Sequence, residues 1–353
     1  MNSNSGKSIH GSIPYTLLRE LGIDPAEVTD FSATVNPYPL PDAVNRLLCG
    51  IDLSAYPDPE CFEARSALAG HLGCDIGQIV MATGTTELLF TLPLLFENAV
   101  CFSPTYGDYG AAFARNGTRI NALPYFAPLQ DFQPVLGRLT AMPPDLLIIC
   151  NPNNPTGDYT GPDRIAEVCR ALPKSVVCID ESYQELGDGC ESVCGMTSEF
   201  DNLLVIKSLS KPYGIGGIRA GYAVTSPEIC GRIGEKLLPW GVSTPAQKMV
   251  PVLISLTGHF MKLWDTTLGE KMKMAGRLEK EGITVRAGQA PFFLAKTGDA
   301  ASMRMNLLTR HNVLVRDCTS FGMPDTIRIM PSLPEQNERL INSINKEFRR
   351  RSS

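Results

Sequence analysis

Short apolar runs recur along the first two thirds of the chain and alternate with stretches of helical periodicity. Each run is apolar on both faces and rich in β-branched residues, which is typical of strands in a parallel or mixed sheet covered by helices. The runs fall at residues 78–82, 98–102, 145–150, 175–179, 202–206 and 218–224, with helical patterns such as 59–72 and 162–172 between them. This alternation predicts an α/β sandwich.

The C-terminal third has a different pattern. A long helical stretch at about 243–281 precedes short strands near 292–296, 313–316 and 326–329, and an amphipathic helix follows at about 334–349. We interpret it as a second, smaller α/β domain. The predicted division is an N-terminal segment at 1–50 that joins the small domain, a large domain at 51–245 and the small domain at 246–353.

Composition narrows the class of protein. The 353 residues carry a formal net charge of −5, which gives no reason to expect a nucleic acid or an anionic membrane as partner. The first seven residues are polar, unlike a signal peptide, and no apolar stretch approaches the ~18–20 residues of a membrane span. The eleven cysteines include no C-x-x-C pair, and Cys190 and Cys194 lack further ligands, so we predict no metal site and a reducing, cytoplasmic location.

Polar clusters stand where the predicted strands end, and ligands of open α/β sheets bind at that edge. Thr85 and Thr86 follow Gly84 at the start of a helix, where free N–H groups can bind an anion, or where the threonines serve only as a helix cap. Tyr106 follows the next strand, and its ring can stack on a flat heterocycle or pack on the core.

Two later strands end in similar clusters. The segment 151–157 has more asparagines than a turn requires, which indicates that one of them, such as Asn154, is held near a ligand. Asp180 and Tyr183 directly follow a buried strand. A carboxylate there needs a cationic partner, either a pyridinium nitrogen or a structural arginine.

The segment 207–219 combines hydroxyls, a lysine, a glycine-rich turn and Arg219. A desolvated Lys211 amine can condense with an aldehyde, while Ser208, Ser210 and Arg219 suit a phosphate; an unrelated glycine-rich loop is the alternative. Near the C-terminus, two arginines, Arg316 and Arg328, stand within apolar strands. They could bind two anionic groups of one substrate, or they could form two structural salt bridges.

The order and spacing of these clusters resemble the fold-type I pyridoxal 5'-phosphate (PLP) enzymes of the aminotransferase class I/II group. The resemblance covers nearly the whole chain and is carried by Asn154-Pro155-x-Gly157, Asp180-x-x-Tyr183, Ser208-x-Ser210-Lys211, Arg219 and Arg328. It implies the type I PLP-dependent transferase fold, with a large α/β/α sandwich around a mixed, mostly parallel sheet and a smaller α/β domain.

The resemblance also implies roles for single residues. Lys211 would bind the cofactor covalently and shuttle the proton at the substrate Cα, and Asp180 would pair with the pyridinium nitrogen. Asn154 and Tyr183 would bond the ring 3'-oxygen, and Tyr106 would stack on the ring. The implied phosphate ligands are Thr85, Thr86, Ser208 and Arg219, with Ser210 a further cofactor contact and Tyr56 reaching the cofactor of a neighbouring subunit, so that a homodimer shares its active sites.

Two subfamilies are most similar, the histidinol-phosphate aminotransferases and the threonine-phosphate decarboxylases of cobamide biosynthesis. Segments 30–37 and 315–322 are more similar to the decarboxylases, although Ser12-Ile13, Thr34 and Tyr38-Pro39 depart from their pattern. We therefore expect decarboxylation of a phosphorylated amino acid, threonine or serine phosphate, with transamination using 2-oxoglutarate and glutamate as the alternative. A binding protein without catalysis is a third hypothesis. The expected substrate contacts are Arg328 for the carboxylate, Arg316 and His10 for the phosphate, and Asn36.

Overall fold

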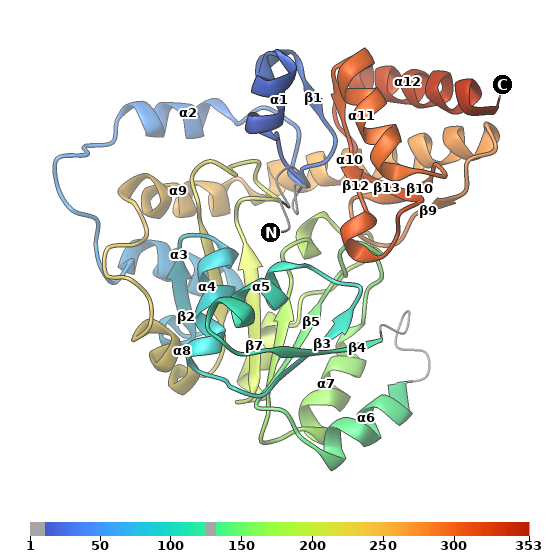
Figure 1. Cartoon of the computed structure of the whole chain (residues 1–353). Coiled ribbons are helices and arrows are strands. Elements are labelled where there is room, and N and C mark those ends of the chain that lie inside the picture. The colour runs from blue at the N-terminus through green and yellow to red at the C-terminus, as the bar shows by residue number, and fades with distance from the viewer. Residues whose placement is uncertain (1–10, 125–131, 353) are drawn as a thin grey trace.

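A seven-stranded sheet forms the centre of the larger part of the molecule (Figure 1). The computed structural model describes residues 11–124 and 132–352. The strand order is β2-β8-β7-β6-β5-β3-β4, and β8 is antiparallel to both of its neighbours while the other pairs are parallel. The strands are β2 (Ile79–Ala82), β3 (Ala99–Ser103), β4 (Ile120–Pro124), β5 (Leu146–Cys150), β6 (Val176–Asp180), β7 (Leu203–Ser208) and β8 (Gly221–Val224). The expected mixed, mostly parallel sheet is confirmed.

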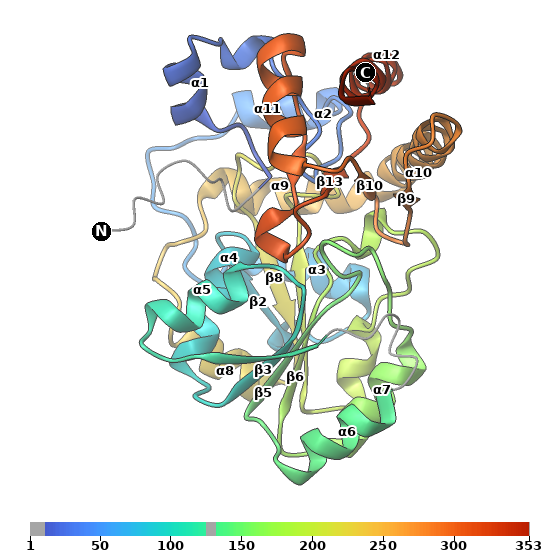
Figure 2. The ribbon, with the colours of Figure 1, turned by 45° about the vertical axis from the view of Figure 1, so that its right-hand side comes forward.

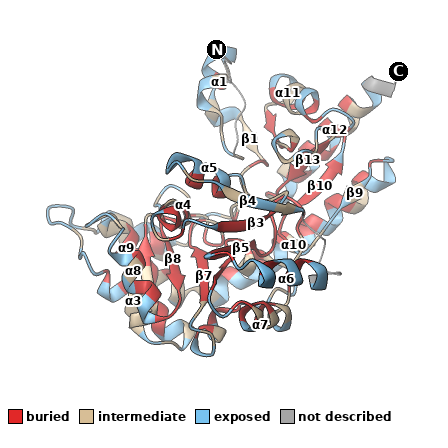
Figure 3. Cartoon of the chain, turned by 60° about the horizontal axis from the view of Figure 1, so that its bottom comes forward, coloured by how far each residue is buried: buried red, intermediate tan, exposed pale blue. Residues whose placement is uncertain are grey.

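Side chains alternate between the two faces of this sheet, and each face has its own apolar cluster. Leu147 and Ile149 of β5 pack with helices α3 (Phe62–Leu72), α6 (Phe132–Ala141), α7 (Pro162–Ala171) and α9 (Thr244–Ser255). Leu146 and Ile148 pack instead with α4 (Thr85–Thr91), α5 (Asp108–Arg115) and α8 (Pro227–Gly234). Apart from the edge strand β4, the strands are therefore buried between two helical layers, as their red colour in Figure 3 shows.

A separate four-stranded sheet lies above the carboxyl edge of the large sheet (Figure 2). It is antiparallel, in the order β12-β13-β10-β9, and has its own apolar cluster with α10, α11 and α12. Its elements are β9 (Val285–Arg286), β10 (Phe293–Lys296), β12 (Arg316–Asp317), β13 (Thr326–Ile329), α10 (Thr257–Lys280), α11 (Ala300–His311) and α12 (Pro334–Ser352).

The N-terminal segment contacts both cores. Leu18 of α1 (Tyr15–Leu21) packs with Leu308 of α11, and β1 (Thr29–Asp30) pairs with β11 (Val313–Leu314). Val44 of α2 (Asp42–Cys49) belongs to the apolar cluster of the large sheet. The predicted division near residues 50 and 245 stays a prediction.

Several predicted elements have different bounds in the structure. The long helix at 243–281 is broken at Leu256, where the Ser255 and Thr257 hydroxyls bond to nearby backbone carbonyls and compete with helical bonding. The strand at 313–316 is divided between β11 and β12, which pair in different sheets.

Two further differences concern the large sheet. The helix predicted from residue 59 begins at Phe62. The preceding residues form a turn instead, because the Asp58 carboxylate accepts hydrogen bonds from the backbone N–H groups of Glu60 and Phe62. Strand β4 has no counterpart in the predicted set, since this edge strand is only partly buried and lacks a continuous apolar run. No helix in the described part of the chain is long and apolar enough to cross a membrane.

Candidate active site

A cavity of about 320 Å³ lies between the carboxyl edge of the large sheet and the four-stranded sheet. Segments distant in sequence meet there because the parallel strands end at the same edge. Of the residues predicted from the sequence, its lining brings together Tyr106, Asn154, Tyr183, Ser210, Lys211, Arg219, Arg316 and Arg328.

Lys211 provides the amine in this cavity. Its Nζ atom lies 4.0 Å from the centroid of the Tyr183 ring and 6.0 Å from that of Tyr106. Lys211 forms no ion pair with any described carboxylate. An amine held against aromatic faces, without an anionic partner, is placed to condense with an aldehyde.

Asp180 is buried at the end of β6, with 3% of its surface exposed. One oxygen accepts the Ser182 backbone N–H at 3.0 Å, and the other accepts the Tyr109 hydroxyl at 2.7 Å. Within the described residues no arginine or lysine pairs with it, so the alternative of a structural arginine partner is wrong for this part of the chain. Asp180 is behind the cavity lining rather than in it, and a protonated ring nitrogen would supply the missing positive charge.

Asn154 and Tyr183, which the sequence predicts to contact a ring oxygen, both line the cavity. The Asn154 side-chain oxygen accepts from Arg328, which leaves its Nδ2 group without an acceptor among the described residues. Both side chains are buried, and the Tyr183 ring packs edge-on against Phe292 at 5.5 Å.

Arg219 marks the predicted phosphate end of the site. It has a left-handed backbone (φ 64°) and donates to the Gly216 carbonyl at 3.0 Å and the Ser210 hydroxyl at 3.4 Å. Gly84 (φ 84°) allows this approach, because a Cβ atom there would lie 2.7 Å from an Arg219 nitrogen.

The other predicted phosphate ligands have different positions. Thr86 and Arg219 line an adjoining cavity of about 590 Å³, and Arg219 belongs to both cavities. Thr85 is the first residue of α4, where backbone N–H groups lack helical partners. Ser208 is buried at the end of β7, outside the lining of either cavity.

Arg316 and Arg328 form the opposite wall. They are cross-strand partners in the β12–β13 pair, so both side chains point to the same face, away from Ile327 and Ile329 in the core. Arg328 donates to Asn154 and, at 2.9 Å, to the Ser32 carbonyl. Among the described residues its Nε group has no partner, and no carboxylate pairs with the guanidinium. The structural salt bridge that was the alternative for Arg328 is therefore absent from the described chain.

The two guanidinium groups affect each other. Burial, together with the neighbouring positive charge of Arg328, lowers the pKa of Arg316 to about 10. Arg316 also donates to the Ser320 hydroxyl at 2.7 Å. Two positive charges in one buried wall favour a ligand with more than one negative charge.

Two of the remaining predicted residues, Asn36 and Tyr56, are not part of the cavity lining. Asn36 is buried outside the lining, with its backbone N–H donating to the Lys211 carbonyl at 2.8 Å and its Nδ2 atom unpartnered. His10 lies outside the described residues. Tyr56 is 85% exposed and packs on Trp240, with ring centroids 5.7 Å apart, rather than lining the Lys211 cavity.

Sequence reasoning missed two residues. Tyr109, whose hydroxyl bonds Asp180, is three positions from Tyr106 on the same loop and helix start, but the sequence does not show that it faces β6. Thr34 lines the cavity, and its buried hydroxyl has no partner within the part of the chain that the structure describes.

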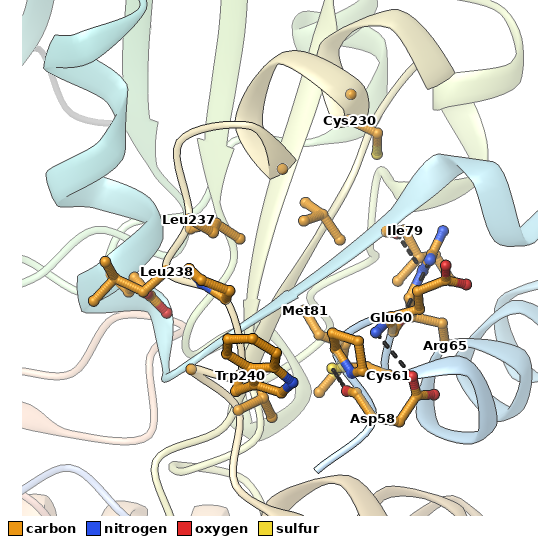
Figure 4. A pocket seen from close by; sticks show the side chains of 18 of the residues that line it. Asp58, Glu60, Cys61, Arg65, Ile79, Met81, Cys230, Leu237, Leu238 and Trp240 are labelled. Carbon is orange, nitrogen blue, oxygen red and sulfur yellow. Dashed lines mark hydrogen bonds between the residues drawn. The ribbon is translucent and has the colours of Figure 1, made fainter. Parts of the chain in front are cut away.

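A larger cavity, of about 610 Å³, lies elsewhere and contains none of the predicted site residues. Figure 4 shows Trp240, Leu238 and Met81 facing Asp58 and Arg65 across it. The Arg65 guanidinium is occupied by the backbone carbonyls of Ile76 and Ile79. Size alone therefore does not identify the site.

Comparisons with known proteins agree with this geometry. A histidinol-phosphate aminotransferase of Bacillus cereus is 27% identical over 333 residues, which cover 92% of this chain and 89% of the relative. The structure of histidinol-phosphate aminotransferase from Sinorhizobium meliloti in complex with PLP superposes with a TM-score of 0.85, at 20% identity, over 99% of this chain and 98% of that one. L-threonine-O-3-phosphate decarboxylase from Porphyromonas gingivalis gives a TM-score of 0.82 at 22% identity, over 90% and 99%.

The residues present fit PLP: an unpaired amine for its aldehyde, a buried carboxylate without a cation for its ring nitrogen, and Arg219 for its phosphate. The fold is the type I PLP-dependent transferase fold, as expected. Residues 26–344 match the aminotransferase class I and II family. The chain therefore belongs to this PLP-dependent family.

Proposed function

We propose that this enzyme transfers the amino group of a phosphorylated amino compound to 2-oxoglutarate. The observation that carries the proposal is the unpaired Lys211 amine in one cavity with the Arg316 and Arg328 guanidinium groups. The relatives named histidinol-phosphate aminotransferase support transamination more than decarboxylation, which reverses the order expected from the sequence.

Bound PLP supplies an electron sink for the bonds at the substrate Cα. Lys211 would hold the cofactor, and its amine would be the base that moves the proton at the substrate Cα. Asp180 keeps the ring nitrogen positive, and Asn154 and Tyr183 orient the ring. Water is restricted because the surrounding strand ends and the Arg328 wall are buried.

The arginine wall selects the substrate. Arg328 binds one anionic group at its unpartnered edge, and Arg316 adds a second positive charge on the same face. A phosphate at one end of the amine substrate and the carboxylates of glutamate in the second half-reaction both match this wall.

Decarboxylation of an O-phospho-amino acid, threonine or serine phosphate, is the second candidate function. The arginine pair favours it, since one guanidinium can hold the carboxylate and the other the phosphate of one substrate. The threonine-phosphate decarboxylase among the structural neighbours shares the fold. In this reaction Lys211 would return a proton to Cα after CO2 leaves, and no keto acid would be consumed.

A homodimer with shared sites completes the proposal. Large apolar side chains are exposed around Tyr56 and Trp240, which favours a covered surface there. These are Leu53, Tyr56, Phe62, Leu238 and Trp240. In the dimer, Tyr56 reaches the cofactor phosphate of the partner subunit, so size measurement should give a dimer, and a Tyr56→Phe variant should bind PLP more weakly.

The deciding experiment incubates the PLP-loaded enzyme with histidinol phosphate, O-phosphothreonine or O-phosphoserine, each with and without 2-oxoglutarate. We expect glutamate and a keto or aldehyde product only when 2-oxoglutarate is present. CO2 and an amino-alcohol phosphate without 2-oxoglutarate would instead establish the second candidate. A Lys211→Ala variant is the control and should show neither product.

A further inference from the structure

Tyr109 supplies the one side-chain hydrogen bond that Asp180 receives within the described chain. We propose that Tyr109 is a positioning residue that keeps the Asp180 carboxylate ionised, so that the proton between this carboxylate and PLP stays on the ring nitrogen. The inference rests on the assignment of Asp180 to the ring nitrogen in the proposed function.

The contact follows from the two-residue period of β6. Val177 and Ile179 point to the sheet face covered by α3 and α7, so Cys178 and Asp180 point to the face covered by α4 and α5. Tyr109, the second residue of α5, lies on that same face. Its hydroxyl reaches the end of β6 and meets Asp180 at 2.7 Å across 71 residues of sequence.

The Tyr109 hydroxyl stays protonated and therefore acts as a hydrogen-bond donor. Burial and the adjacent Asp180 charge raise the pKa of Tyr109 well above its usual value, so its hydroxyl keeps the proton that it donates. Burial likewise raises the pKa of Cys150, the residue of β5 in register with Asp180, to about 12, so this thiol stays neutral. Tyr109 and Cys150 are therefore both neutral neighbours of Asp180 on this face, and the Tyr109 hydroxyl donates to the carboxylate directly.

A hydrogen bond to the charged form of a carboxylate lowers its affinity for protons. Without the Tyr109 hydroxyl, a carboxylate that is 3% exposed would become more basic and would draw the shared proton away from the ring nitrogen. An unprotonated ring withdraws electrons less strongly, so the effect would extend to the reaction at the substrate Cα.

The test needs no substrate. Apoprotein is loaded with PLP labelled with ¹⁵N in the ring, and the nitrogen resonance of the resting enzyme is recorded by NMR. Tyr109→Phe removes one oxygen and keeps the ring, which packs edge-on against Tyr106 at 5.7 Å. We expect the variant resonance to move toward that of an unprotonated pyridine, with the preference for the protonated nitrogen reduced about tenfold or more.

Two further variants make the result specific. Tyr222→Phe removes another buried phenol from the same sheet and should leave the resonance unchanged. Replacing Tyr109 by 3-fluorotyrosine keeps a stronger donor in place and should leave the nitrogen protonated, a result that is accessible even if Tyr109→Phe does not fold.

An unchanged resonance in a folded Tyr109→Phe variant would overturn the inference, as would loss of the protonated signal with 3-fluorotyrosine. Asp180→Asn separates this failure from a wrong assignment of Asp180. If Asp180→Asn moves the resonance and Tyr109→Phe does not, only the role of Tyr109 is wrong. If neither moves it, the pairing of Asp180 with the ring nitrogen is wrong too.

Discussion

Two buried cations in this molecule have opposite surroundings. Lys207, on β7, is 3% exposed and donates to Gln184 at 2.6 Å, with carboxylate oxygens of Glu185 and Glu181 at 2.8 and 3.1 Å. Arg328, on β13, is 4% exposed, but its partners are an amide oxygen and a backbone carbonyl, and its Nε group has none.

This difference distinguishes a cation with a structural role, Lys207, from one that we propose binds a ligand, Arg328. Burial opposes the charge of Lys207, yet Glu185 and Glu181 overcome it and raise the pKa of the ammonium well above its usual value. The chain neutralises this cation itself, as a structural role requires. Arg328 receives no such compensation from the described chain, which is why we propose an anionic ligand as its partner.

The largest expected effect is a loss of stability when Lys207 is replaced. Lys207→Met leaves the buried Glu181 and the partly buried Glu185 carboxylates without their cation, and should lower the free energy of unfolding by about 3–5 kcal/mol. Denaturant titration followed by circular dichroism measures this loss. Lys248→Met is the control, because Lys248 pairs with Glu63 on the surface and should cost at most about 1 kcal/mol. Equal losses in the two variants would remove the structural role of the buried cluster.

Arg328→Gln tests the other side. The variant should lower kcat/KM for the anionic substrate about 100-fold while PLP still binds, since a desolvated contact to an anion is lost. Its melting temperature should stay within about 4 °C of that of the wild type. Arg277→Gln, a surface change on α10, should alter neither quantity. A large drop in melting temperature with intact kcat/KM would make Arg328 structural.

The smallest expected effect concerns Glu347, a buried carboxylate that is surrounded by cations, whereas Lys207 is a buried cation near carboxylates. The Glu347 side chain is 1% exposed. Its carboxylate oxygens lie 2.8 Å from a guanidinium nitrogen of Arg310, 2.8 Å from one of Arg350 and 3.0 Å from the His311 Nε2 atom. Burial raises its pKa, but His311, Arg310 and Arg350 outweigh burial, and the net pKa lies below the ordinary value of 4.5.

The sign of the resulting pH dependence follows from this lowered pKa. Stability from Glu347 is fully present above the ordinary glutamate pKa and is lost as the pH falls through the lower value in the folded protein. Wild type should therefore lose more stability than Glu347→Gln between about pH 6 and about pH 3. Denaturant midpoints at several pH values measure it, and parallel curves for the two proteins would contradict it.

Most of the proposed cofactor residues could be named from the sequence because their positions are local properties of the chain. Asp180, Lys211 and Asn154 each follow a buried apolar strand, and parallel strands bring such positions to one edge of the sheet. The departures lay at element ends, such as Leu256 between α9 and α10, where hydroxyl groups compete for backbone bonds.

Periodicity and residue type by themselves therefore determined the sandwich of helices around a mostly parallel sheet, and they singled out Lys211 as the lysine proposed to hold the cofactor. Tertiary structure alone decided that Tyr109 bonds Asp180, that Arg316 and Arg328 share one face, and that Lys207 rather than Arg328 receives carboxylates. The physical reason is range: burial patterns act over a few residues, whereas these contacts depend on strand register and on which helix covers which face.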